Sequence, residues 1–139
     1  MILSQACKYG LRAVVHLAGK GDQSVLSRDI ARELSIPEHF LAKILQDLSK
    51  NKLLLSFKGR GGGFRLARPA SEIRLLEVIQ AIDGPQFGQG CLLGLPQCSD
   101  EAPCPLHYQW SEIKSRIMLA LGATTIGHVL AGELPAELA

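Results

Sequence analysis

Two short apolar segments, residues 53–57 and 64–67, are separated by the run KGRGGG at residues 58–63. Such a glycine-rich run is unsuited to a helix, because glycine loses more backbone freedom on folding than any other residue. Its glycines instead allow the positive φ angles that tight turns require. The two segments are therefore predicted to pair as a β-hairpin that carries the charges of Lys58 and Arg60 at its tip.

Three helices are predicted before the hairpin. The first has Ser4 as its candidate N-cap and runs to about residue 19. The second is short, covers residues 28–34 and has Ser27 as its candidate N-cap. The third covers residues 37–51 and has Pro37 at its first position, where proline is favoured. Apolar side chains recur along this third helix at intervals of three and four residues, as in an amphipathic helix: Phe40, Leu41, Ile44, Leu45 and Leu48.

The second and third helices, joined by a tight turn, form a helix-turn-helix pattern. Basic and amide side chains on the third helix are typical of a recognition helix, but also of an ordinary helical hairpin with a solvated face. The basic hairpin that follows favours the first interpretation, because the two together describe a winged helix, whose wing can place Arg60 in a minor groove. The predicted fold is mainly α with a small β-hairpin wing, and residues 1–83 are predicted to form a winged helix-turn-helix DNA-binding domain.

The formal net charge of +2 is unevenly distributed along the chain. Residues 37–68 carry +5, whereas residues 69–139 carry −5. This asymmetry predicts that the basic part faces a polyanion, here double-stranded promoter DNA. The candidate contacts are His39, Phe40 and Lys43 for the major groove, Lys50, Lys58 and Arg60 for the phosphates and the minor groove, and Ser27, Arg28, Pro37, Gly61 and Gly62 on the same elements.

Three of the four cysteines, Cys91, Cys98 and Cys104, lie within residues 84–104, a stretch rich in glycine and proline that is predicted to be a loop. His107 follows the last of them by three residues, so both side chains can reach one centre. Thiolates are soft ligands for iron–sulfur clusters, zinc or Cu(I), and an imidazole can supply the fourth bond. The residues leave three alternatives open: an iron–sulfur cluster, a structural zinc site, or reduced thiols that act as a switch.

Residues 105–139 are predicted to contain a long helix, residues 105–121 with Pro105 at its first position, and a short last helix before the C-terminal tail. The long helix has a single apolar seam, which can pair with the same helix of a second copy or pack on its own domain. We expect the first, a homodimer. The seam consists of Leu106, Trp110, Ile113, Ile117 and Leu121.

Other classes of protein find little support. No apolar run approaches the ~18 residues of a membrane span. No signal peptide is recognisable, so we expect a cytoplasmic protein without a membrane partner. Paired acids, a nucleophile with its base, and a nucleotide fingerprint are all missing, so we expect neither an enzyme nor a small-molecule substrate. Cys7, in the first helix, is expected to be a small buried residue.

Taken in order, the helix-turn-helix, the wing FKGRGGGFRL, the helix LLEVIQAIDG and the loop CLLGLPQCSDEAPCPLH resemble the IscR/NsrR/RirA group of bacterial transcription regulators over essentially the whole chain. The resemblance implies a homodimeric repressor or activator whose affinity for DNA depends on an iron–sulfur cluster bound by the three loop cysteines. It also implies a fourth ligand placed like His107, which favours a [2Fe–2S] cluster over a [4Fe–4S] cluster. The signal would be iron, cluster supply, nitric oxide or redox state.

The chain departs from the pattern of this group at three places. Six residues separate Cys91 from Cys98, where members that control cluster biogenesis have five. Residues 7–9, CKY, offer no carboxylate of the kind that nitric-oxide-sensing members supply as a ligand. Ala42 stands where the cluster-biogenesis regulator has a glutamate that discriminates between DNA sites. Members that act in cysteine metabolism lack the loop cysteines, so the resemblance favours the cluster-binding branch.

Overall fold

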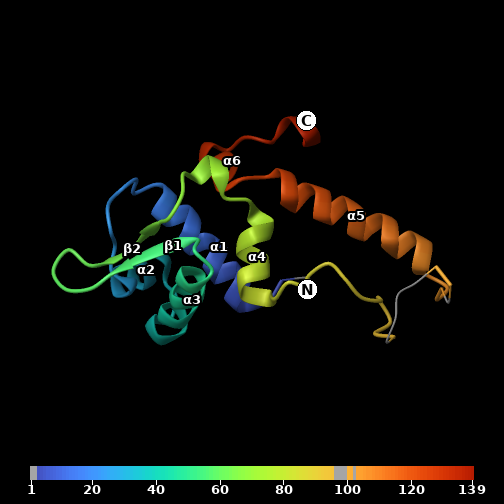
Figure 1. The fold of residues 1–139 in the computed structure, drawn as a ribbon, viewed down its shortest axis with the longest axis horizontal. Helices are drawn as coiled ribbons and strands as arrows, with labels where there is room; N and C mark the ends of the chain where they lie inside the picture. The colour runs from blue at the N-terminus through green and yellow to red at the C-terminus, as the bar shows by residue number, and fades with distance from the viewer. Residues whose placement is uncertain (1–2, 96–99, 102) are drawn as a thin grey trace.

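The computed structural model describes residues 3–95, 100–101 and 103–139. Most of this described chain is helical, and a two-stranded antiparallel hairpin and the long helix α5 extend from it in opposite directions (Figure 1). The elements are α1 (Gln5–Ala18), α2 (Ser27–Leu34), α3 (Glu38–Lys50), β1 (Leu54–Phe57), β2 (Gly63–Leu66), the short 3-10 helix η1 (Ala70–Glu72), α4 (Leu75–Asp83), α5 (His107–Ala123), α6 (Ile126–Ala131) and the 3-10 helix η2 (Ala136–Leu138).

The turn between α2 and α3 forms the helix-turn-helix without a glycine. Ser35 follows α2 in the left-handed conformation, with φ 55°. The N–H groups of Ser35 and Ile36 donate to the carbonyls of Arg32 and Ala31, at 3.3 and 2.9 Å, which ends the helix in a Schellman motif. Because Ile36 is buried at this corner, the turn is anchored to the core and the start of α3 is fixed.

The wing is attached to the segment that leads into α2. β1 and β2 pair with Phe57 opposite Gly63 at the end nearest the tip. On the other side of β2, Val25 forms a one-residue bridge in which it and Phe64 exchange two backbone hydrogen bonds of 2.9 and 2.8 Å. This bridge holds the hairpin in a fixed position relative to the helix-turn-helix.

Gly63 lies against that bridge, where a side chain does not fit. Its φ is +123°, and a Cβ would lie 2.4 Å from the carbonyl carbon and oxygen of Val25. Gly63→Ala is therefore expected to lower the free energy of unfolding by about 2–4 kcal/mol, measured by chemical denaturation. The matched control is Gly61→Ala, at φ +71° with nothing within 4 Å of its Cβ, for which we expect a loss of about 1 kcal/mol. Equal losses of unfolding free energy in the two variants would contradict a clash between a Cβ at residue 63 and the carbonyl of Val25.

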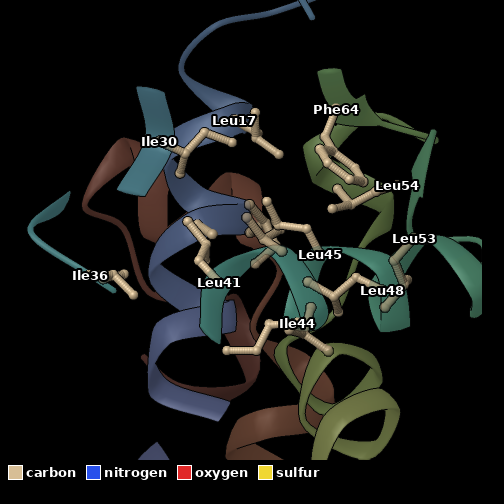
Figure 2. Close-up of a cluster of buried hydrophobic side chains, with 14 of the residues drawn as sticks. Leu17, Ile30, Ile36, Leu41, Ile44, Leu45, Leu48, Leu53, Leu54 and Phe64 are labelled. Carbon is tan, nitrogen blue, oxygen red and sulfur yellow. The ribbon is translucent and has the colours of Figure 1, made fainter. Parts of the chain in front are cut away.

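A single apolar core joins the wing to the helices (Figure 2). Leu17 of α1, Ile30 of α2, Leu41 and Leu45 of α3 and Phe64 of β2 converge in it. Each large aliphatic side chain that is fully buried contributes roughly 1.5–3 kcal/mol to folding. α3 and the wing are therefore held as one unit.

The long helix α5 is attached to this unit at its C-terminal end. The N–H of Leu75 donates to the carbonyl of Thr124 at 2.9 Å, and the N–H of Ile126 donates to the carbonyl of Ile73 at 2.8 Å. The rest of α5 extends away from the core (Figure 1), and His107 is its buried residue. Neither α5, with 17 residues, nor another helix of the described chain is long and apolar enough to cross a membrane.

Three predicted helix starts were wrong by one or two residues. Ser27 is the first residue of α2 rather than its N-cap, because the hydrogen bonds of this helix already begin at the carbonyl of Leu26. Pro37 is the cap that precedes α3. Pro105 precedes α5 by two residues, because a turn from Cys104 comes before the first helical residue.

Candidate DNA-binding surface and cysteine loop

Most of the residues predicted to contact DNA are exposed. They are Arg28 at the start of α2, Pro37, His39, Phe40, Lys43 and Lys50 on or beside α3, and Lys58, Arg60 and Gly61 in the wing. Ser27 is half-buried and Gly62 is buried. A Cβ at Gly62 would lie 2.6 Å from the carbonyl oxygen of Phe57 and 2.7 Å from that of Gly59, so this glycine shapes the turn.

A groove of about 690 Å³ lies between the wing tip and the beginning of α2. Arg60 of the wing and Arg28 of α2 both line it, so two residues that are 32 positions apart in the sequence contribute positive charge to one groove. The groove also contains Asp29 and Glu33. Asp29 pairs with Arg32 at 2.6 Å, and Glu33 also has basic partners, so these acids are partly neutralised.

Phe40 has a double role at the start of α3. Its ring meets the ring of Tyr9 edge-on, with the centroids 5.6 Å apart, and its side chain remains 40% exposed. The contact holds the beginning of α3 on α1. The exposed part of the ring remains available for an apolar contact, such as the methyl group of a thymine.

The cysteine loop brings Cys91 and Cys104 together. Their Sγ atoms are 3.9 Å apart. Two thiolates bound to one tetrahedral metal at about 2.3 Å stand roughly 3.8 Å apart, so this separation fits two ligands of one metal. Backbone N–H groups of Leu95 and Leu93, together with the Cys104 thiol, lower the pKa of Cys91 and favour its thiolate. Cys98 lies outside the described residues.

His107 is placed beside a carboxylate. It is buried as the first residue of α5, and its Nε2 lies 2.7 Å from Oδ1 of Asp100. Its backbone N–H donates to the carbonyl of Cys104 at 3.0 Å. Within residues 3–95, 100–101 and 103–139, no three His, Cys, Asp or Glu side chains are grouped closely enough to hold a metal ion. Of the three predicted ligands within these residues, Cys91 and Cys104 are the two whose side chains lie together.

The attachment of the loop to α5 was not predicted. Trp110 Nε1 and Lys114 Nζ both donate to the carbonyl of Gly90, at 3.2 and 2.9 Å. One turn further along α5, Met118 packs over Gly88, where a Cβ would lie 2.3 Å from its sulfur. The spacing of four residues puts these three side chains on one face of α5. In the sequence, the signal that could have indicated this contact is the spacing of four residues between these side chains, together with the two glycines in the loop.

The residues of the predicted dimer seam lie in two different environments. Trp110 and Ile117 line a pocket of about 490 Å³ together with the cysteine loop. Leu106 is 42% exposed and Ile113 is 49% exposed, while Leu121 is half-buried. One part of the seam therefore packs on the same chain, and another part is exposed in the single chain.

Cys7 is separate from the loop cysteines. It is fully buried in α1, and burial together with the neighbouring Asp83 raises its pKa to about 12. Asp83, the last residue of α4, also accepts hydrogen bonds from the backbone N–H of Ser4, at 3.1 Å, and from its hydroxyl. The prediction that Cys7 is buried is confirmed, and its thiol stays protonated.

Comparison with known proteins identifies the family. Residues 3–132 match the Rrf2 model, described as an iron-dependent transcriptional regulator. The chain belongs to the Rrf2 family. An Aquifex aeolicus (strain VF5) protein with the provisional name HTH-type transcriptional regulator is 38% identical over 128 residues, 91% of this chain and 89% of that protein. IscR of Vibrio atlanticus is 30% identical over 131 residues, 94% of this chain and 75% of IscR.

A solved structure extends the comparison. CymR, the global cysteine regulator of B. subtilis, superposes with a TM-score of 0.80 at 25% identity and covers 95% of this chain and 98% of its own. Rrf2 proteins are transcriptional regulators that bind DNA, and they are not enzymes. The predictions of a winged-helix regulator and of a non-enzyme are thereby confirmed.

Proposed function

We propose that this Rrf2 protein is a homodimer whose affinity for promoter DNA is set by an iron–sulfur cluster bound by Cys91, Cys98 and Cys104, with His107 as fourth ligand. The observation that carries the proposal is the 3.9 Å separation of two loop sulfurs, which suits two ligands of one metal. A [2Fe–2S] cluster is favoured and a [4Fe–4S] cluster is the alternative. When bound, the cluster supplies a centre that iron supply, redox state or nitric oxide can alter.

The DNA-binding part of the proposal rests on the exposed basic surface. The start of α3, with His39 and Lys43, is exposed and suits the major groove. The wing tip, with Lys58 and Arg60, is exposed beside the groove at α2 and suits the sugar–phosphate backbone and the minor groove. Such contacts bind DNA with an affinity that falls as salt rises.

Arg60→Ala is expected to weaken binding to every duplex and to reduce the slope of log K against log salt by about one. Fluorescence anisotropy measures this at several salt concentrations, with a duplex that the wild-type protein selects from a random-sequence pool. The control is Arg116→Ala, which removes the same charge from an exposed position, 78% accessible, on α5. Unchanged affinity and slope for Arg60→Ala would remove the wing from the DNA-binding surface.

The position of His107 supports its role as a ligand. Histidines bound to metals usually hydrogen-bond through their other ring nitrogen to a carboxylate or a carbonyl, which fixes the ring. The 2.7 Å contact with Asp100 is of this kind. Asp100 would then orient the imidazole rather than bind the metal.

α5 is suited both to dimerisation and to transmitting the state of the cluster. It begins at His107 beside the cysteine loop and ends where its corner is hydrogen-bonded to α4 and η1. A change in the loop would therefore shift α5 relative to the helix-turn-helix. In a dimer built on Leu106 and Ile113, that shift changes the spacing of the two recognition helices, which must match half-sites about 34 Å apart.

A regulator that uses the same thiols without a metal is the second candidate. It is favoured by the same approach of Cys91 to Cys104, which also suits a reaction between the two thiols. A zinc-stabilised regulator is the third. Metal analysis separates the three, because the thiol-based form contains no metal, and the zinc form contains about one zinc per chain and no sulfide.

A further inference from the structure

We propose that Cys91 and Cys104 form a reversible disulfide in the metal-free protein, made by a peroxide and opened by a thiol. Their Sγ atoms are 3.9 Å apart, about 2 Å more than the length of an S–S bond. Both cysteines are partly exposed, so a small oxidant can reach them. The pair therefore meets the two first requirements for a disulfide, proximity and access.

The backbone beside Cys91 leaves room for the closure. Gly90 directly precedes it and Gly94 follows it by three residues, at φ +107° and +74°, and nothing lies within 4 Å of the position of a Cβ at either glycine. Cys104 is held at the start of α5, because its carbonyl accepts a hydrogen bond from the N–H of His107 at 3.0 Å. Closure therefore needs a movement of Cys91 toward Cys104, without rearrangement of α5.

The reaction requires a two-electron oxidant, for which we name hydrogen peroxide. The Cys91 thiolate attacks one peroxide oxygen, the O–O bond breaks, hydroxide leaves and a sulfenic acid remains on the sulfur. The Cys104 thiolate attacks that sulfur, the S–S bond forms, the S–O bond breaks and a second hydroxide leaves. The protons lost by the two thiols convert both hydroxides to water. Two thiols and one peroxide thus give one disulfide and two waters.

The disulfide would exclude the cluster, because it consumes two of its thiolate ligands. This consequence rests on the function proposed above, whereas the disulfide itself does not. Oxidised protein would take up no iron until a thiol reductant opened the bond. The same pair of sulfurs would then respond to metal supply by binding the cluster and to peroxide by forming the disulfide.

The positions of the acidic residues make the bond easy to detect. Trypsin and a glutamate-specific protease together release residues 78–101, with Cys91 and Cys98, and residues 102–112, with Cys104. Metal-free full-length protein is treated with one equivalent of hydrogen peroxide, its remaining thiols are alkylated, and the non-reduced digest is analysed by mass spectrometry. We expect the two peptides to be joined through Cys91 and Cys104, with Cys98 alkylated, and dithiothreitol to separate them.

Cysteine variants identify which two sulfurs form the disulfide. Cys98→Ser should keep the joined product, Cys91→Ser should lose it, and Cys7→Ala, which changes a buried residue of α1, should keep it. Oxidised wild-type protein should take up at least about tenfold less iron than the same protein after reduction. A product joined through Cys98, or two alkylated cysteines at 91 and 104, would overturn the disulfide. If the reduced protein takes up iron and sulfide but peroxide gives no joined product, the disulfide alone is overturned. If peroxide gives the joined product but the protein takes up no iron even after reduction, the cluster alone is overturned.

Discussion

Cys104→Ser protein, purified without oxygen, is expected to contain less than about a tenth of the iron and sulfide of the wild-type protein. A serine hydroxyl is a much poorer ligand for a soft metal centre than a thiolate. The change removes one of the two sulfurs that lie 3.9 Å apart and leaves the other without its neighbour. The visible absorption of the cluster should disappear together with the metal.

Cys7→Ala is the matched control for this loss. Cys7 is fully buried in α1 and is hydrogen-bonded to Asp83 rather than to the loop, so the variant should keep the iron and sulfide of the wild-type protein. Iron and sulfide retained by Cys104→Ser would remove this residue from the ligand set. Zinc without sulfide in the wild-type protein would replace the cluster with a structural zinc site.

Ile113→Asp is expected to convert the proposed dimer to monomers. Ile113 is 49% exposed in the single chain, in the middle of a helix that is attached to the core at its far end. A carboxylate at the centre of a dimer interface loses its water without gaining a partner, so we expect the Kd of the dimer to rise at least about a hundredfold, or about 2.8 kcal/mol. Sedimentation velocity measures this change, and the affinity for a two-half-site duplex should fall with it.

Ser115→Asp is the control for Ile113→Asp. Ser115 is exposed on the same helix, away from the seam, and the substitution adds the same charge. It should leave the protein dimeric, and circular dichroism of both variants should retain the helical signal of the wild-type protein. A dimeric Ile113→Asp protein, or equal dissociation of both variants, would place the interface elsewhere.

The fold follows from local signals to a large extent. The periodicity of α3 and the glycine-rich turn of the wing are visible in the sequence, and both elements are present, although α3 begins one residue later than predicted. The helix-turn-helix corner was harder, because Ser35 takes a left-handed conformation that usually indicates glycine. The bridge from Val25 to Phe64 joins residues that are far apart in the chain, and no local pattern predicts such a pairing.

The candidate site could be predicted in residue type but not in arrangement. The spacing of the cysteines indicated a shared centre, and Cys91 and Cys104 do lie together. Asp100 beside His107 was missed, because an acidic residue in a loop gives no sign of its partner. Trp110 was assigned to a dimer seam on its periodicity alone, although its indole N–H donates to Gly90 of the cysteine loop. Only the three-dimensional arrangement shows which residues of the seam contact the loop and which stay exposed.

The most direct test of cluster control is a DNA titration of one anaerobic preparation, before and after a chelator has removed its iron. Both forms are titrated against the same selected duplex at the same salt concentration, and their iron and sulfide contents are measured in the same samples. We expect the two Kd values to differ by at least about fivefold, the lower end of the coupling that is typical between an effector and a second ligand. Equal Kd values, with loss of the iron verified, would contradict control of DNA binding by the cluster.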